Sequence, residues 1–194
     1  MRNFFLKLCL IGVFVFGFSL VLAGTYSGGN GTESTPYQIS NTVDLIELSQ
    51  TRGDWDKYFY QMNDITFPDD ETTVDWDDDG SADGSGTSGF SAIGNSGTYF
   101  TGNYDGGDHT INYLYINRDA SGQGMFGYCG DGAVVENLGL LNVDITSTAS
   151  IGGSSVGGLI GMTGAGGTRT SVSSCYVTGA VYGKSAVGGM VGFN

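Results

Sequence analysis

Four aspartates in one acidic loop are spaced like calcium ligands. Counted from the first, they stand at relative positions 1, 3, 5 and 9: Asp75, Asp77, Asp79 and Asp83. Calcium takes about six to eight oxygen ligands, and a glycine at position 6, here Gly80, permits the bend of an EF-hand-type loop. Position 12, which carries a bidentate glutamate in such loops, is Gly86, although Asp69, Asp70 or Glu71 could substitute. We therefore predict a weak Ca²⁺ site, with a solvated acidic loop as the alternative.

Side chains suited to catalysis are sparse. His109 is the single histidine, so the chain cannot supply the two histidines one turn apart that a zinc-protease helix needs. A Ser-His-Asp triad would also have to use His109. We interpret His109 as a structural hydrogen-bonding residue in a turn, and we expect no catalysis.

A polysaccharide hydrolase or lyase is the enzyme alternative. A hydrolase needs two placed carboxylates, and the candidates lie in Gly-rich turn signals: Asp105, Asp108 and Asp131. A lyase acting on an acidic sugar would use basic residues, which are scattered along the chain: Arg118, Arg169 and Lys184. Aromatic residues could instead form a sugar-stacking ladder or pack in the core: Tyr113, Tyr115, Tyr176 and Tyr182.

A repeat of slightly more than thirty residues organises the second half of the chain. The segment Val156–Gly161 recurs as Val187–Gly192, 31 residues later, and Gly124–Gly127 is a looser copy 34 residues before Gly158. Several short strand-like segments and turn glycines per repeat are typical of one coil of a solenoid.

Strand-like segments between these copies also match. Aligning 136–143 with 173–181 places Leu138 with Cys175 and Leu140 with Val177, an alternation that directs one set of side chains inward. We therefore predict an all-β fold, a parallel β-helix whose glycines allow corners where a side chain would clash. Cys129 and Cys175 could form a disulfide, but a small buried hydrophobe also explains Cys175.

The N-terminal part is expected to cap the solenoid. Residues 41–48 have a polar N-cap, an early acid and apolar positions, so they predict one short helix. Residues 58–67 read as the first strand, and 68–97 as a long polar loop. Downstream, Asp105-Gly106 predicts a tight turn between strands, and Thr110 to Ile116 should alternate between two faces.

Residues 1–23 have the pattern of a secretory signal peptide. Arg2 and Lys7 supply a basic start, the run from Leu8 to Leu22 is uncharged, and cleavage is expected after Ala23. The run is short for a helix spanning a hydrocarbon core of about 30 Å, and we expect no membrane span in the mature chain. Cleavage would leave 5 basic residues against 20 acidic ones, a net charge of −15. Such a charge argues against nucleic acid and disfavours acidic polysaccharides unless a cation bridges.

As a set, the repeats resemble the GLUG-motif family. The resemblance rests first on two copies of the core motif, Gly158-Leu159-Ile160-Gly161 and Gly189-Met190-Val191-Gly192. It rests also on the strand at 174–181 and on the stretch 100–111. It also covers the opening at 26–32 and the segment 36–39, and so spans most of the mature chain. This resemblance implies a right-handed parallel β-helix of secreted or surface bacterial proteins, including adhesin-like proteins and the non-catalytic repeats of some IgA-degrading metallopeptidases. It carries no catalytic residues.

We accordingly expect four regions: a signal peptide (1–23), an N-terminal cap (24–67), an acidic Gly/Ser-rich loop (68–97) and β-helix coils (98–194). The expected function is a structural or adhesive binding segment, secreted or on the cell surface, whose partner is a carbohydrate or a surface protein. Because the chain stops at Asn194, directly after Val191-Gly192-Phe193 and without a polar cap, we further expect truncation and self-association through an open C-terminal coil.

Overall fold

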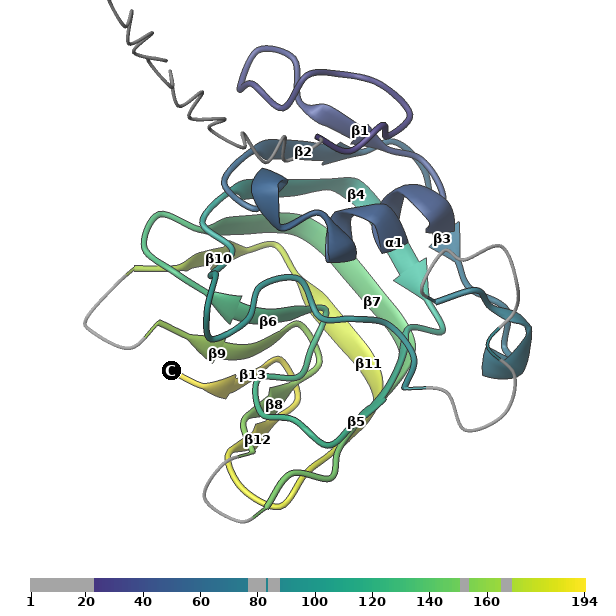
Figure 1. Ribbon diagram of the computed structural model, residues 1–194, viewed down its shortest axis with the longest axis vertical. Helices are drawn as coiled ribbons and strands as arrows, with labels where there is room; N and C mark the ends of the chain where they lie inside the picture. The colour runs from purple at the N-terminus through teal and green to yellow at the C-terminus, as the bar shows by residue number, and fades with distance from the viewer. Residues whose placement is uncertain (1–22, 77–82, 84–87, 151–153, 165–168) are drawn as a thin grey trace, which may run out of the picture.

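A computed structural model describes residues 23–76, 83, 88–150, 154–164 and 169–194. Within these residues the fold is mostly β, with parallel pairing between all its named strands and one short α-helix (Figure 1). In chain order the elements are β1 (Tyr37–Ile39), α1 (Thr42–Gln50), the 3₁₀ turn η1 (Arg52–Asp54), β2 (Tyr58–Gln61), β3 (Ile65–Thr66), the 3₁₀ turn η2 (Glu71–Thr73), β4 (Asn103–Asn112), β5 (Tyr115–Arg118), β6 (Phe126–Cys129), β7 (Val134–Ser147), β8 (Val156–Gly157), β9 (Ile160–Thr163), β10 (Ser171–Ser173), β11 (Tyr176–Tyr182), β12 (Val187–Gly188) and β13 (Val191–Phe193).

The largest sheet stacks successive segments of the chain in parallel. Its strands follow the order β1-β2-β4-β7-β10, and β3, β5 and β11 extend it by pairing with β4 or β7. The long strand β7 pairs with the earlier strands β4 and β5 and with the later strands β10 and β11. Leu140 therefore lies in register with both Ile111 and Val177, which confirms the predicted alignment of Leu140 with Val177.

Copies of the repeated motif stack in two narrower sheets. Ile160 of β9 pairs with Phe126 of β6 and with Val191 of β13, while Val156 of β8 pairs with Val187 of β12. These pairs reproduce the offsets of 34 and 31 residues that the sequence predicts. Parallel strands with like residues in register are consistent with a solenoid.

Corners in the large sheet use the left-handed backbone conformation at equivalent positions. Asp108, Asn137 and Ser174 have φ values of 63°, 54° and 53°. Asp108 and Asn137 directly precede the paired residues His109 and Leu138, so their corners stack on each other. Asn and Asp tolerate this conformation better than most residues, which explains their use here.

The tight turn predicted at Asp105-Gly106 is wrong. β4 continues through both residues, and its register against β7 shifts between Asp105 and His109. Gly107 and Asp108 take positive φ in this bulge. Because β2 and β7 hold β4 in parallel from two sides, the extra residues are absorbed locally and the chain does not reverse.

The two-faced alternation predicted for Thr110 to Ile116 is also wrong. Ile111, Leu114 and Ile116 are all fully buried. The reason is a corner between β4 and β5, where Tyr113 has a φ of 61°. This corner shifts the alternation of inward and outward side chains by one residue. Ile111 and Leu114, three residues apart, therefore both point inward.

The N-terminal cap begins one strand earlier than expected. β1 pairs with β2, with Tyr37 in register with Phe59, so β1 is the first strand of the described chain. The strand predicted at 58–67 is divided into β2 and β3. The predicted helix is confirmed as α1, because the Asn41 side chain accepts a hydrogen bond from the backbone N–H of Asp44 at 3.0 Å.

Two carboxylates tie residues 24–26 to this cap. The backbone N–H of Gly24 and the hydroxyl of Tyr26 both donate to Asp54 Oδ2, at 2.8 and 3.1 Å. Glu47 of α1 accepts from the backbone N–H groups of Thr25 and Tyr26, at 2.7 and 3.2 Å. Burial and the neighbouring Asp54 carboxylate raise the pKa of the Tyr26 phenol, so Tyr26 remains a hydrogen-bond donor.

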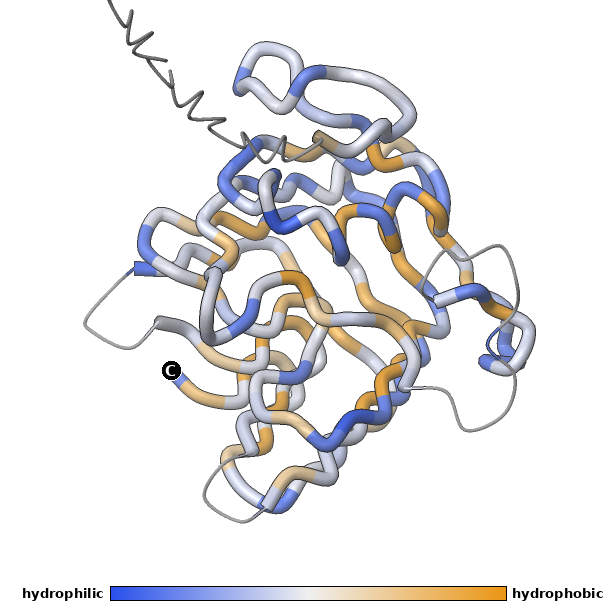
Figure 2. Tube along the Cα trace, in the orientation of Figure 1, coloured by the Kyte–Doolittle hydropathy of each residue, from blue (hydrophilic) through white to orange (hydrophobic). Residues whose placement is uncertain are grey.

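One hydrophobic cluster runs through the described residues, aromatic near the N-terminal end and aliphatic farther along. Hydrophobic residues gather along the strands and α1, with hydrophilic residues in the connecting loops (Figure 2). The aromatic part contains ring contacts from Tyr26 and Tyr37 through Phe59 and Phe100 to Phe126.

The described residues of segment 68–97 contribute apolar side chains to the core, although the segment is predicted as a polar loop. Trp76 stacks on Phe67 with ring centroids 4.9 Å apart, and Phe90 contacts the same ring edge-on. Ile93 is fully buried and forms a parallel bridge with Phe126. These few apolar residues are separated by Asp, Gly and Ser, so composition hides them.

Of the predicted signal peptide, residues 1–22 lie outside the described residues. Export therefore remains a prediction. No helix in the described ranges is long and apolar enough to cross a membrane.

Candidate functional site

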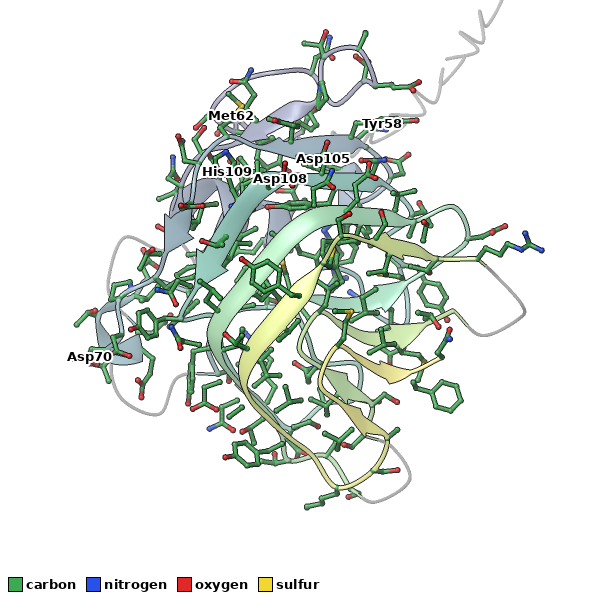
Figure 3. All side chains as sticks on the ribbon, turned by 180° about the vertical axis from the view of Figure 1, so that it is seen from behind. Tyr58, Met62, Asp70, Asp105, Asp108 and His109 are labelled. Carbon is green, nitrogen blue, oxygen red and sulfur yellow. The ribbon has the colours of Figure 1, made fainter. Side chains whose placement is uncertain are left out.

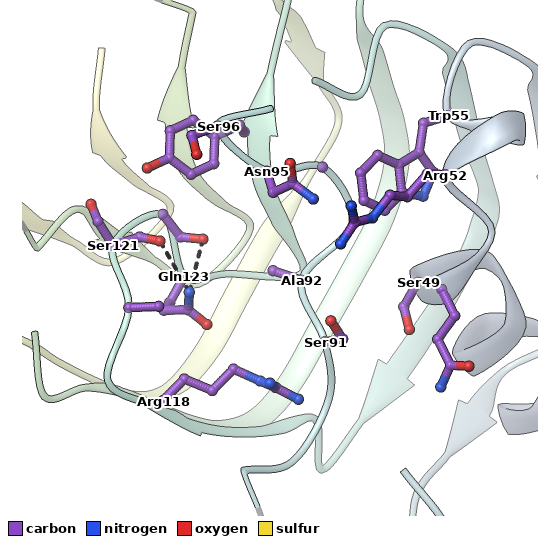
Figure 4. A pocket seen from close by; sticks show the side chains of 15 residues that line it. Ser49, Arg52, Trp55, Ser91, Ala92, Asn95, Ser96, Arg118, Ser121 and Gln123 are labelled. Carbon is purple, nitrogen blue, oxygen red and sulfur yellow. Dashed lines mark hydrogen bonds between the residues drawn. The ribbon is translucent and has the colours of Figure 1, made fainter. Parts of the chain in front are cut away.

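A polar pocket of about 640 Å³ lies where the cap meets two later segments (Figure 4). Its walls come from the end of α1 and η1, from residues 91–96, from residues 118–123 and from Tyr128 of β6. Side chains with hydroxyl and amide groups line most of it. Two arginines, Arg52 and Arg118, also line it, whereas none of its described lining residues is Asp or Glu.

Arg52 is placed by the junction between α1 and η1. α1 ends at Gln50, and the indole of Trp55 donates to the backbone carbonyl of Leu48 at 2.8 Å, which holds η1 against the helix. Asp54 of the same turn is buried, and its carboxylate accepts hydrogen bonds from Gly24 and Tyr26. The Arg52 side chain is exposed and extends toward the pocket interior (Figure 4).

Arg118 enters from the opposite wall, at the end of β5 (Figure 4). Its guanidinium donates from Nε to the carbonyl of Phe90 at 3.1 Å and from Nη2 to that of Gly89 at 2.6 Å. These two bonds fix the side chain and leave further N–H groups of the fork for other acceptors. Burial lowers the pKa of this guanidinium, while the charge of Asp83 acts in the opposite direction.

Gln123 supplies the most unusual group of the pocket. Its Nε2 donates to the carbonyls of Ser121 and Gly122, at 3.1 and 3.2 Å, so the two acceptors determine which end of the amide faces them. The other end, Oε1, is a buried acceptor that no donor among the described residues reaches. The residue is 4% exposed, and a buried acceptor without a donor costs about 1–3 kcal/mol.

Backbone pairing prevents Gln123 from relaxing. Its N–H donates to the carbonyl of Ser155, and its carbonyl accepts from Gly157, so it is part of the parallel stack. The amide oxygen is therefore held in place at the pocket wall.

Only two of the four predicted calcium ligands, Asp75 and Asp83, lie within the described residues. Asp77 and Asp79 lie outside them, with Gly80 and Gly86. Asp83 Oδ2 accepts the backbone N–H of Trp76 at 2.7 Å, which brings the two ends of the acidic loop together. Elsewhere in the described chain, no group of three or more His, Cys, Asp or Glu residues could hold a metal ion. The Ca²⁺ site thus stays a prediction.

Three of the residues considered for catalysis, Asp105, Asp108 and His109, lie close together on β4 (Figure 3). The Asp105 carboxylate accepts from the Gly107 N–H and from the Asn137 side chain, so it stabilises the β4 bulge. His109 Nδ1 lies 3.4 Å from Asp64, and Asp131 accepts the backbone N–H of Arg169.

Lys184 donates to the carbonyl of Thr148, apart from the pocket. Of the basic residues named for a lyase, Arg118 is the one that lines the pocket.

The four tyrosines proposed as a ladder have separate surroundings. Tyr115 contacts Trp76, Tyr113 forms a corner, and Tyr176 lies over Gly139. Tyr182 is exposed. Among the described ring contacts none joins two of these four residues. Cys129 and Cys175 are free thiols, the first buried and the second half-buried, and burial raises the pKa of both.

Sequence reasoning missed Arg52 and Gln123 as site residues. Arg52 follows a helix, and Gln123 lies in a Ser-Gly-Gln-Gly turn signal, so neither carries a motif. The available signal was charge scarcity, because Arg52 and Arg118 are two of only five basic residues after residue 23.

Comparison with known proteins gives distant relatives. No protein-family model matches the chain. The chain is 33% identical over 177 residues to halomucin of Haloquadratum walsbyi, a match covering 88% of this chain and 2% of halomucin. It is 29% identical over 125 residues to an Evansella cellulosilytica protein described as a Gly-rich membrane protein, covering 64% of this chain and 13% of that one.

One solved structure, described as an immunoglobulin A1 protease from Bacteroides ovatus, superposes with a TM-score of 0.44 and 18% identity, covering 87% of this chain and 64% of that one. The chain thus spans a small fraction of both sequence relatives and less than two thirds of this structure.

Proposed function

We propose that the chain is a secreted or cell-surface repeat segment of the GLUG type, a right-handed parallel β-helix with a structural and adhesive role and no catalysis. The observation that carries this proposal is the parallel, in-register stacking of like segments. Phe126, Ile160 and Val191 occupy equivalent positions in three successive strands. Such a stack presents a rigid, extended surface, which suits binding better than it suits a closed catalytic centre.

The names of the sequence relatives support a location at or outside the cell envelope. One is called halomucin, and the other is described as a Gly-rich membrane protein. The predicted signal peptide agrees with export. The chain matches a small part of each relative, so we propose that it acts as one binding region of a larger assembly of repeats.

A polysaccharide hydrolase or lyase is the competing function, together with a non-catalytic repeat region of a larger secreted enzyme. A hydrolase would need two carboxylates free to reach a glycosidic bond. The Asp105 carboxylate is instead engaged by Gly107 and Asn137 within the β4 bulge. This engagement favours the binding role.

A glycan-array screen run beside a reducing-sugar release assay tests the proposal. We expect the chain from Gly24 to Asn194 to bind a subset of glycans and to release no sugar from the polysaccharides that carry them. Release of reducing ends, or of unsaturated uronate products, would replace the adhesive role with catalysis. Binding of an immobilised surface protein without glycan binding would retain the adhesive role and change the partner.

A further inference from the structure

The pocket lined by Arg52, Arg118 and Gln123 contains both a hydrogen-bond acceptor and hydrogen-bond donors that are available to a ligand. Gln123 Oε1 is a buried acceptor at the wall of the pocket (Figure 4), and no donor among the described residues reaches it. The two arginines carry guanidinium N–H groups that need acceptors, preferably charged ones. A ligand that satisfies both must present a donor and an anion within one small volume.

We infer that this pocket binds the carboxylated sugar unit of an acidic polysaccharide, a uronate. This inference deepens the proposed function, on which it rests, by naming the ligand class of the binding segment.

Each part of a uronate has a matching group in the pocket. A carboxylate accepts two parallel N–H donors from a planar guanidinium, and two arginines approach from opposite walls (Figure 4). A ring hydroxyl can donate to Gln123 Oε1, which no donor among the described residues reaches. Remaining hydroxyls meet a hydrophilic wall: Ser49, Ser91, Asn95, Ser96 and Ser121.

The polar wall also distinguishes a sugar from a peptide carboxylate. Peptide recognition uses apolar subsites for side chains, whereas serine, asparagine, glutamine and arginine supply nine of the fifteen residues that line this pocket. Tyr128, stacked on Tyr99 with ring centroids 5.8 Å apart, gives one half-buried aromatic wall of the kind that sugars contact.

The local charge of the pocket opposes the charge of the whole chain. Residues 24–194 carry a net charge of −15, which disfavours acidic polysaccharides at long range. Long-range repulsion is screened beyond a Debye length of about 8 Å at physiological salt, whereas a half-buried guanidinium such as Arg118 is screened much less. The pocket therefore accepts a uronate that the overall charge would repel.

Calorimetric titration of the chain from Gly24 to Asn194 with trigalacturonate, in the presence of EDTA, tests this inference. EDTA removes cation bridging through the acidic loop. We expect binding of the free acid, and at least about tenfold weaker binding of the fully methyl-esterified trisaccharide, because loss of a charged hydrogen bond typically costs that much. N-acetylglutamate, a carboxylate without a sugar ring, should bind as weakly as the ester.

Arg52→Gln is the matching variant, since the Arg52 side chain makes no hydrogen bond or ion pair with the described residues and its loss should not unfold the chain. Affinity for trigalacturonate should fall at least about tenfold. Arg169→Gln is its control, because it changes the net charge equally at an exposed position outside the pocket. It should remain within about twofold of the parent chain. In NMR spectra, the side-chain amide signals of Gln123 should shift on binding.

Equal affinity for the acid and the ester, or equal losses in Arg52→Gln and Arg169→Gln, would overturn the inference. Binding of neutral glycans alone would overturn it as well while leaving the adhesive role intact. Sugar release by the chain would instead contradict the proposed function itself, so the two failures can be told apart.

Discussion

Two copies of one motif, 156–161 and 187–192, differ in what covers them. Leu159 is fully buried and donates its N–H to the carbonyl of Met190 in the following copy. Met190 is only partly buried. A Cβ at Gly158 would lie 2.5 Å from the carbonyl oxygen of Gly189, whereas a Cβ at Gly189 would meet nothing within 4 Å. Equivalent positions are thus fully buried in the first copy and only half-buried in the second.

Close approach of backbones explains why the motif contains glycine. Gly157, Gly158 and Gly161 are absent from the positive-φ residues of the described chain, so the motif does not need glycine for a left-handed turn. Backbone atoms approach within 2.2–2.6 Å of where a Cβ would stand at these positions: Ile160 of the same copy at Gly157, Gly189 of the following copy at Gly158 and Gln123 of the preceding stacked segment at Gly161. Close approach of backbones, both within a copy and between stacked copies, is the constraint.

The largest expected contrast is between Leu159→Ala and Met190→Ala. Leu159→Ala should lower the free energy of unfolding by about 2–5 kcal/mol because it leaves a cavity in the stack, and Met190→Ala by about 1 kcal/mol. Urea denaturation of both variants measures this. Equal losses would mean that both copies are equally covered, and would contradict the difference in burial.

At the N-terminal end, Asp54 should contribute a comparable amount of stability. If cleavage follows Ala23, the Gly24 nitrogen that lies 2.8 Å from Asp54 Oδ2 becomes an ammonium group and forms an ion pair with this buried carboxylate. A chain with a free Gly24 amine should be more stable than its N-acetylated form by about 1–3 kcal/mol. N-terminal sequencing of secreted material should begin at Gly24. Membrane-bound protein that still carries Met1 would contradict the cleavage.

The matched glycine pair gives the next contrast. Gly158→Ala should destabilise the chain by about 1–3 kcal/mol, because the new methyl group meets the Gly189 carbonyl and Val177. Gly189→Ala should change stability by less than about 0.5 kcal/mol. Thermal unfolding of the two variants provides the measurement. A neutral Gly158→Ala would show that the strands do not approach as closely as described.

Exposed apolar residues in the second copy should promote association of the chain from Gly24 to Asn194. Val187 and Phe193 are 45% and 54% exposed on the uncovered copy. Sedimentation should show concentration-dependent self-association that Val187→Lys weakens about tenfold or more. Val43→Lys, on a valine of α1 that is 55% exposed, is the control and should not alter the association. A concentration-independent monomer would refute association through this surface.

Calcium binding should have the smallest effect on stability. This effect should not depend on substitutions in the two motif copies. With a dissociation constant on the order of 10⁻⁴ to 10⁻³ M, millimolar Ca²⁺ should stabilise the fold by about 1 kcal/mol through mass action. Asp77→Ala and Asp79→Ala should abolish the rise in melting temperature, while Gly158→Ala should retain it, since distant effects add. If millimolar Ca²⁺ neither changes the melting temperature nor gives binding heat, the loop is a solvated acidic segment that binds no calcium.

Much of the stacking could be predicted from the sequence, because repetition is visible without coordinates. The offsets of 34 and 31 residues and the alignment of Leu140 with Val177 follow from like residues recurring at a fixed spacing. The helix cap at Asn41 was predictable for a local reason, since the cap residue and the backbone N–H of Asp44 that donates to it lie three residues apart. Strand boundaries failed where glycines form bulges within a strand that is paired on both sides, as at Gly107.

By itself, the sequence determined the repeat period, the strand-rich composition and the position of the capping helix, because these depend on neighbouring residues and on self-similarity. Only the tertiary structure decided that Arg52, Arg118 and Gln123 share one pocket, since it joins segments far apart in the chain. It also decided that Leu159 is core while Met190 is partly exposed. Burial and site formation depend on which segment stacks next, and a residue's own sequence neighbourhood does not contain that information.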